Sequence, residues 1–166
     1  LALICFILIS FQPASAQEAN VKFGKIDKED FEITSFQGDT SYSAIVLYEH
    51  GRSFFTFDKY HGFRLNFTNH CRIKILKNSG YKYADIIIPL YHNNSSEESV
   101  SSLKGYTYNL ENGKINKEKL RSRDKYTEDV SENRKNVKFS MPDVKTGSII
   151  EYQYNVISDF AWSLKE

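Results

Sequence analysis

Residues 62–76 alternate in polarity with a period of two. The small or apolar members of one parity are Leu65, Phe67, Cys71, Ile73 and Ile75. The polar members of the other parity are Arg64, Asn66, Thr68, His70, Arg72 and Lys74. Because successive side chains of a β-strand point to opposite faces, this pattern predicts one long strand with a buried face and a solvated face.

Shorter strand patterns occur along most of the remaining chain after residue 42. Residues 43–50 and 52–58 flank Gly51, which predicts a hairpin, and the Asn112-Gly113 pair predicts a tight type I′ hairpin between residues 106–110 and 114–120. Further strand patterns cover residues 81–91, 137–141 and 148–158. About eight short strands separated by turn signals predict an all-β fold, mainly an antiparallel β-sandwich or barrel-like sheet.

Helical signals are short. One helical turn is predicted around residues 25–31 and one short helix between residues 127 and 134. The second falls in the charged stretch 121–136, which is interpreted as a solvated connector. The aromatic content of 14%, with 11 Tyr and 12 Phe, favours β-structure, whereas the net charge of +1 gives no electrostatic footprint for nucleic acid.

The first residues carry an export pattern. An apolar run over residues 1–11 leads to Pro13 and then to Ala14-Ser15-Ala16, the small-x-small pattern that signal peptidase cleaves. The run is too short to span a bilayer, so residues 1–16 are predicted to be a cleaved signal peptide, with no membrane span left afterwards. We therefore expect an exported protein, periplasmic or extracellular, with a polar segment over residues 17–40 and a β-sandwich domain over residues 41–166. The missing initiator Met and the abrupt C-terminus suggest part of a longer protein.

Cysteine chemistry is restricted to one residue. Cys5 leaves with the predicted signal peptide, so the mature chain keeps Cys71 and no intrachain disulfide. With the adjacent His70 as base, Cys71 could be a nucleophile. However, neighbouring side chains on a strand point to opposite faces, so the imidazole and the thiol diverge. Cys71 also shares the parity of Phe67 and Ile73, so we interpret it as a buried structural cysteine.

No other constellation predicts chemistry. The histidines His50, His61, His70 and His92 show no metal-ligand spacing. The carboxylates Asp85, Glu111 and Glu151 are isolated in or beside strands, with no facing pair for glycoside hydrolysis. We therefore expect no catalytic residue, no metal site and no cofactor in this segment.

Five phrases resemble a known family. They are residues 21–26 (VKFGKI), 70–76 (HCRIKIL), 84–91 (ADIIIPLY), 103–114 (LKGYTYNLENGK) and 147–152 (GSIIEY). In this order they resemble the DUF3857 domain, the N-terminal module of exported transglutaminase-like proteins of Bacteroidetes. The resemblance implies a β-rich module without assigned activity, followed by a transglutaminase-like fold. The Cys-His-Asp triad of that fold would lie beyond Glu166, so the resemblance transfers no catalytic residue to this chain.

Two functions follow as expectations. The first is a non-catalytic, exported β-sandwich module that positions or feeds substrate to a downstream transglutaminase-like or cysteine-protease-like domain of the same polypeptide. The alternative is an independent glycan- or peptide-binding or adhesion module with a protein, peptide or glycan ligand. Its stacking platform would use tyrosines such as Tyr60, Tyr81, Tyr83 and Tyr91.

Overall fold

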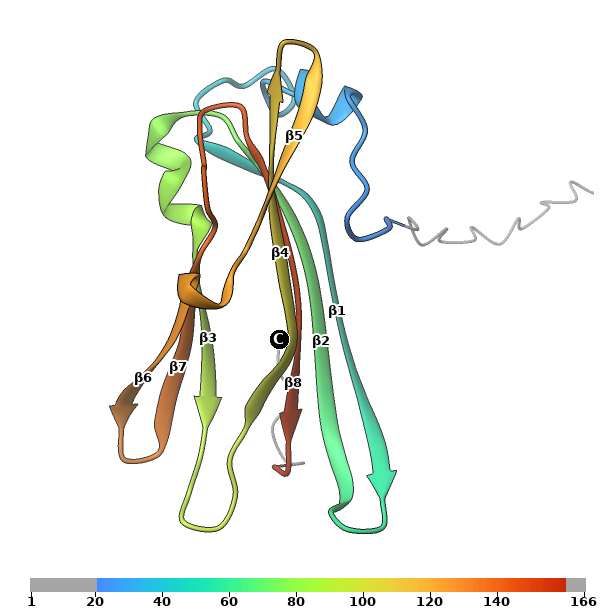
Figure 1. The fold of residues 1–166 in the computed structure, drawn as a ribbon, viewed down its shortest axis with the longest axis vertical. Coiled ribbons are helices and arrows are strands. Elements are labelled where there is room, and N and C mark those ends of the chain that lie inside the picture. The colour runs from blue at the N-terminus through green and yellow to red at the C-terminus, as the bar shows by residue number, and fades with distance from the viewer. Residues whose placement is uncertain (1–20, 161–166) are drawn as a thin grey trace, which may run out of the picture.

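The computed structural model describes residues 21–160, which form two antiparallel sheets. The five-stranded sheet has the order β1 (Ala44–Asp58), β2 (Gly62–Ile75), β8 (Ile149–Ser158), β4 (Ser99–Glu111) and β5 (Lys114–Lys119). The three-stranded sheet has the order β3 (Asp85–Tyr91), β7 (Arg134–Ser140) and β6 (Lys125–Ser131) (Figure 1). The predicted all-β class is confirmed. The predicted signal peptide, residues 1–16, lies outside the described residues.

The described residues also form three short 3₁₀ helices: η1 (Glu29–Glu32) before β1, η2 (Asn78–Ala84) between β2 and β3, and η3 (Ser122–Asp124) between β5 and β6. Helix η1 overlaps the predicted turn around residues 25–31. Helix η2 occupies the first residues of the strand predicted for 81–91, so that strand begins four residues later, at Asp85. Within the described part of the chain, no helix is long and apolar enough to cross a bilayer.

The core lies between the two sheets, on what we call the inner face of the five-stranded sheet. The odd-numbered apolar residues of β2 contact the even-numbered ones of β8 there, so the predicted buried face of residues 62–76 is confirmed. Buried members of this core are Phe67, Cys71, Ile73, Ile75, Ile88, Leu90, Phe139, Met141, Ile150, Tyr152 and Val156.

The hairpin predicted at Gly51 is wrong, because β1 runs through this residue as one strand of 15 residues. Gly51 pairs with Asn69 in an uninterrupted register from Tyr48 to Asp58. A Cβ at this position would lie 3.1 Å from the ring of Phe67. Gly51 therefore leaves room for the buried ring of Phe67. A glycine inside a strand can mark such a close approach as well as a bend in the chain.

The helix predicted between residues 127 and 134 is also wrong. Residues 125–140 form a β-hairpin, and β7 is the central strand of the smaller sheet. The side chain of Phe139 is buried in the core, with Val137 packed against it. The edge strand β6 is exposed at every residue after Lys125, so its charged side chains are solvated although the segment is a strand.

The Asn112-Gly113 hairpin is confirmed. Both residues have positive φ, 51° and 75°, as a type I′ turn requires. Strands β4 and β5 pair on either side of it, from Glu111↔Lys114 to Tyr106↔Lys119.

Candidate functional site

The outer face of the five-stranded sheet is not solvated along its whole length. Arg72 and Lys74, expected on a wet face of β2, are buried, with exposures of 6% and 3%. Residues 22–32, including η1, lie across this part of the sheet and cover both side chains. Figure 1 shows this blue segment beside the upper ends of β1 and β2. Asn66, a third residue expected on the solvated face, is also buried, with an exposure of 6%, so the expectation of a solvated face is wrong at these three positions.

Glu151 of β8 is the centre of a buried polar cluster under this segment. Its Oε1 accepts hydrogen bonds from His70 Nε2 at 2.9 Å and from Arg72 Nη2 at 2.8 Å. Its Oε2 accepts from the Tyr108 hydroxyl and from the Gly24 backbone amide, both at 2.8 Å. We call Glu151, His70, Arg72 and Tyr108 the Glu151 cluster.

The register of the sheet brings these residues together. Arg72 of β2 pairs directly with Glu151 of β8. On the other side of β8, Glu151 pairs with Tyr106 of β4, and Tyr108 lies two residues further along β4, on the same face. The rings of Phe23 and Tyr48 contact the His70 ring edge-on, at centroid distances of 5.4 and 4.9 Å. The cluster is thus built from three adjacent strands and closed by the N-terminal segment.

The two basic side chains of β2 bind the N-terminal segment directly. Arg72 also donates to the carbonyl of Lys25 and pairs with the Asp30 carboxylate at 3.3 Å. Lys74 Nζ donates to the carbonyl of Phe31 at 3.0 Å and lies 4.9 Å from the centre of its ring. Buried charges are tolerated only when paired in this way.

Burial by itself would raise the pKa of Glu151. The hydrogen bonds from Arg72, His70, the Gly24 amide and Tyr108 outweigh burial, so the pKa of Glu151 is lowered from its ordinary value. Burial and the neighbouring carboxylate of Glu151 raise the pKa of the Tyr108 hydroxyl. The cluster therefore holds a carboxylate anion and a neutral phenol at neutral pH, with both carboxylate oxygens occupied by donors.

The pair His70-Cys71 is divided between the two faces of the sheet. His70 binds Glu151 on the outer face, whereas Cys71 is 2% exposed within the inner core. Burial raises the pKa of the Cys71 thiol to about 11, so the thiol is protonated at neutral pH and is a poor nucleophile. The interpretation of Cys71 as a structural residue agrees with this placement.

The other candidate residues lie apart from one another. Asp85 accepts a hydrogen bond from the Ser140 hydroxyl, and Glu111 pairs with Lys145 at 2.8 Å. Within residues 21–160, no group of three or more His, Cys, Asp or Glu side chains is arranged to hold a metal ion.

The tyrosines proposed as a stacking platform are also separated. Tyr81 and Tyr83 belong to η2, whereas Tyr60 lies in the turn between β1 and β2. The ring of Tyr91 packs on Phe160 at a centroid distance of 4.8 Å. These residues therefore form no common surface for a sugar ring.

A shallow groove of about 280 Å³ lies between β4 and the smaller sheet. Its apolar walls are Leu90, Val100, Leu103 and Val137, and its charged lining residues are Glu98, Lys125 and Lys135. Strand β5 pairs with β4 from Tyr106 onward, so residues 99–104 of β4 have no β5 partner beside the groove. This volume is just below the range of about 300–1,000 Å³ that is typical of ligand pockets.

Sequence reasoning missed the Glu151 cluster. One signal was available: Glu151 is a carboxylate inside an otherwise apolar strand pattern, and it needs a partner if that strand is central. The identity of the partners depends on strand order, which the one-dimensional pattern does not contain.

The geometry defines an antiparallel β-sandwich domain whose buried polar groups bind its own N-terminal segment. Residues 63–163 match the family model of DUF3857, a domain of unknown function with a solved structure. The match covers more than half of the chain, and the protein belongs to the DUF3857 family.

A candidate protease from Parabacteroides distasonis ATCC 8503, solved by crystallography at 2.00 Å resolution, is similar with a TM-score of 0.49 and 12% sequence identity. The likeness covers 64% of this chain and 21% of that one, so this chain spans about a fifth of that protein's length. The search of curated proteins found no match.

Proposed function

We propose that this domain is a non-catalytic, exported module of a transglutaminase-like or cysteine-protease-like protein, which positions or feeds substrate to a downstream catalytic domain. The observation that carries the proposal is the division of His70 and Cys71 between opposite faces of one sheet. Cys71 is the single cysteine of residues 17–166, and it is buried away from solvent and from His70.

The Glu151 cluster supports the same proposal. General acid–base catalysis requires a titratable group within reach of a substrate proton. Both oxygens of Glu151 are instead occupied by internal donors, and His70 is held between Glu151 and two aromatic rings. Groups arranged in this way hold the N-terminal segment and keep the domain rigid.

The test compares the domain alone with the longer natural protein. Purified residues 17–166 should show no peptidase or transamidase turnover, and Cys71→Ala should change nothing in that assay. The longer protein should be active, and a cysteine beyond residue 166 should be required. Turnover by residues 17–166 that a single substitution abolishes would overturn the proposal.

The groove beside β4 favours one form of the alternative function, binding of an extended peptide. A peptide strand can add to residues 99–104 of β4 by main-chain hydrogen bonds, with alternate side chains directed into the groove. Lys135 is paired with the Glu97 carboxylate and Glu98 also lines the groove, so the lining charges select no single sign of side chain in such a peptide. A peptide library screened against residues 17–166 would test this, with Val100→Glu as the blocking variant. A clean negative in the library removes the peptide-binding function.

A further inference from the structure

The edge strands of the two sheets differ in how they are protected. The edges are β1 and β5 in the larger sheet, and β3 and β6 in the smaller one. An exposed edge can pair with a strand of another chain, and proteins prevent this with short strands, lysines, prolines or bulges. Strand β5 has six residues with three lysines, β3 contains Pro89, and the pairing of β6 shifts between Asp129 and Ser131. Strand β1 has 15 residues and contains neither lysine nor proline.

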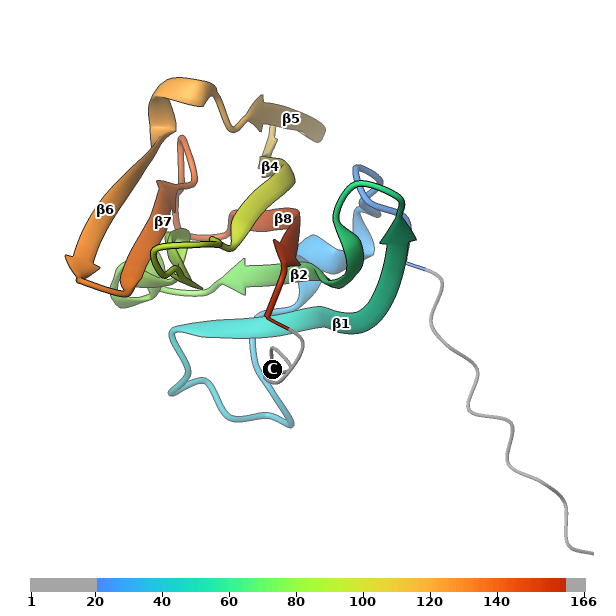
Figure 2. The ribbon, with the colours of Figure 1, turned by 90° about the horizontal axis from the view of Figure 1, so that it is seen from below.

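The free edge of β1 runs along one side of the molecule. Within residues 21–160, β1 pairs with β2 and with no other strand. Figure 1 shows β1 at the right-hand margin of the larger sheet, and Figure 2 shows it outside β2 in the view from below. The register with β2 shifts between Val46 and Tyr48 and then runs without interruption to Asp58. Residues 48–58 therefore offer a regular edge to a further strand.

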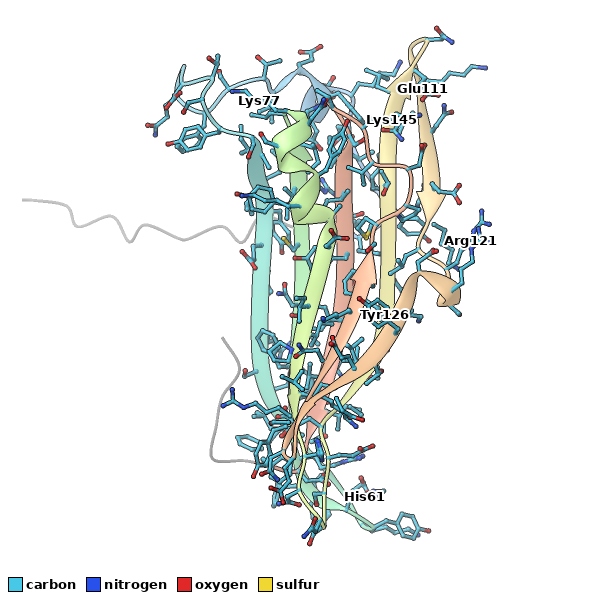
Figure 3. The ribbon with its side chains drawn as sticks, turned by 90° about the vertical axis from the view of Figure 1, so that its left-hand side faces the viewer. His61, Lys77, Glu111, Arg121, Tyr126 and Lys145 are labelled. Atoms are coloured by element: carbon cyan, nitrogen blue, oxygen red, sulfur yellow. The ribbon has the colours of Figure 1, made fainter. Side chains whose placement is uncertain are left out.

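The same part of β1 exposes aromatic side chains. Phe55 and Phe57 are 53% and 64% exposed, and the neighbouring Phe63 of β2 is 71% exposed. The rings of Phe57 and Phe63 lie 5.0 Å apart, beside the turn that Figure 3 marks with His61. Contiguous exposed aromatic surface marks a contact site. Since these rings adjoin the free backbone edge, one added strand can contact both.

We infer that β1 is a dimer interface, on which the β1 strand of a second copy of this chain pairs antiparallel about a twofold axis at Ser53. Ser53 is the centre of residues 48–58, so this register pairs the whole uninterrupted segment with its counterpart. A twofold contact is self-complementary, because each contact between two residues is made twice. The dimer does not require a downstream catalytic domain, and so the inference is independent of the proposed function.

This register places compatible side chains opposite each other. Directly opposed residues of an antiparallel pair lie on one face, with Cβ atoms about 4.5–5.5 Å apart. Phe55 lies opposite Gly51 of the second copy, where an aromatic ring covers a position that has no side chain. Arg52, which lies 5.1 Å from the centre of the Phe54 ring in its own chain, also faces Phe54 of the second copy.

Neighbouring registers fit less well. An axis at Arg52 would place two guanidinium groups directly opposite each other, which is destabilising. An axis at Phe54 would pair only residues 50–58, because β1 ends at Asp58. The axis at Ser53 avoids both problems, and the charged residues Glu49 and Arg52 then each face a phenylalanine.

Cross-linking tests the register directly. In the chain without the predicted signal peptide, Ser53→Cys places two thiols opposite each other at the axis, within the separation that a disulfide bridges. We expect a covalent dimer under mild oxidation, and Cys71 is buried and does not compete. The matched control is Thr56→Cys, also exposed on β1, whose two copies would lie about 20 Å apart along the strands and should not cross-link. Equal cross-linking of the two variants would overturn the inference.

Self-association is the second measurement. Sedimentation of the natural chain should show a monomer–dimer equilibrium, and Ser53→Lys, which opposes two charges at the axis, should weaken the dimer by about tenfold or more. Tyr126→Lys, at a 59% exposed residue of β6 away from His61 (Figure 3), should leave the equilibrium unchanged. Circular dichroism checks that Ser53→Lys is folded, and Ser53→Cys tests the interface if it is not.

Three outcomes of sedimentation contradict the inference. A monomer at every concentration would leave the edge of β1 to a different partner. A dimer that folded Ser53→Lys leaves intact would assign the contact to another surface. An open-ended assembly in place of a dimer would exclude a closed twofold contact.

Discussion

The two faces of the five-stranded sheet are both buried in their upper half, but by different chemistry. The inner face packs apolar side chains such as Ile150 against the smaller sheet. On the outer face, the neighbouring residue Glu151 lies in a polar cluster under the N-terminal segment. Apolar contact is non-directional and tolerates repacking, whereas a buried ion pair is stable only with every partner in place. The outer face therefore binds one specific segment, residues 22–32, through its polar side chains. The inner face stabilises the fold through apolar contacts that are not specific to one partner.

The largest effect is expected for the outer face. Glu151→Ala leaves Arg72 and His70 buried without their anion, which costs about 3–5 kcal/mol when one partner of a buried pair is removed. Urea unfolding measures the loss. The matched control is Glu111→Ala, an exposed carboxylate paired with Lys145, where about 0–1 kcal/mol is expected. Equal losses for both variants would contradict the contrast between the two environments.

The adjacent residue tests the inner face. Ile150→Ala creates a cavity in the core and should destabilise the fold by about 2–5 kcal/mol. Ile87→Ala, at a 55% exposed isoleucine of β3, should change stability by less than about 0.5 kcal/mol. Ile150→Ala should leave the protease resistance of residues 22–32 intact, whereas Glu151→Ala should reduce it. Release of the segment by both variants would show that the two faces do not act separately.

A smaller effect distinguishes the continuous β1 strand from a hairpin. Gly51→Val places a branched side chain against the Phe67 ring, and overpacking of this kind costs about 1–3 kcal/mol. Ser53→Val, at an exposed position of the same strand and face, is the control and should be tolerated. Denaturant midpoints measure both. If Gly51→Val were as stable as the natural chain, the close approach to Phe67 would be wrong.

The smallest expected effect is the pH dependence that Glu151 contributes. Its pKa is lowered in the folded state, so its contribution to stability is present above the unfolded pKa of about 4.5 and is lost as the pH falls through the folded pKa. Each unit of pKa lowering corresponds to about 1.4 kcal/mol. The difference in unfolding free energy between the natural chain and Glu151→Gln should shrink on acidification from pH 6 towards pH 3. A difference that is constant over this range would contradict a charged Glu151.

Local patterns predicted the parts of the fold that depend on short-range physics. The alternation of residues 62–76 predicted β2 and its buried parity, and Asn112-Gly113 predicted its hairpin, because pleat and turn geometry are properties of the chain itself. The same logic placed Cys71 and His70 on opposite faces. It failed at Gly51 and at residues 127–134, where packing against Phe67 and the position of β7 in a sheet decided the outcome.

The sequence by itself determined that the described residues form antiparallel strands, and that Cys71 lies on the apolar face of its strand, opposite His70. Tertiary structure alone decided what covers the other face. Glu151 acquired its role because strand order places it between Arg72 and Tyr108, with residue 24 folded over them. The physical reason is range: side-chain alternation acts between neighbours in the chain, whereas a buried charge is satisfied by groups 43 to 127 residues away in sequence.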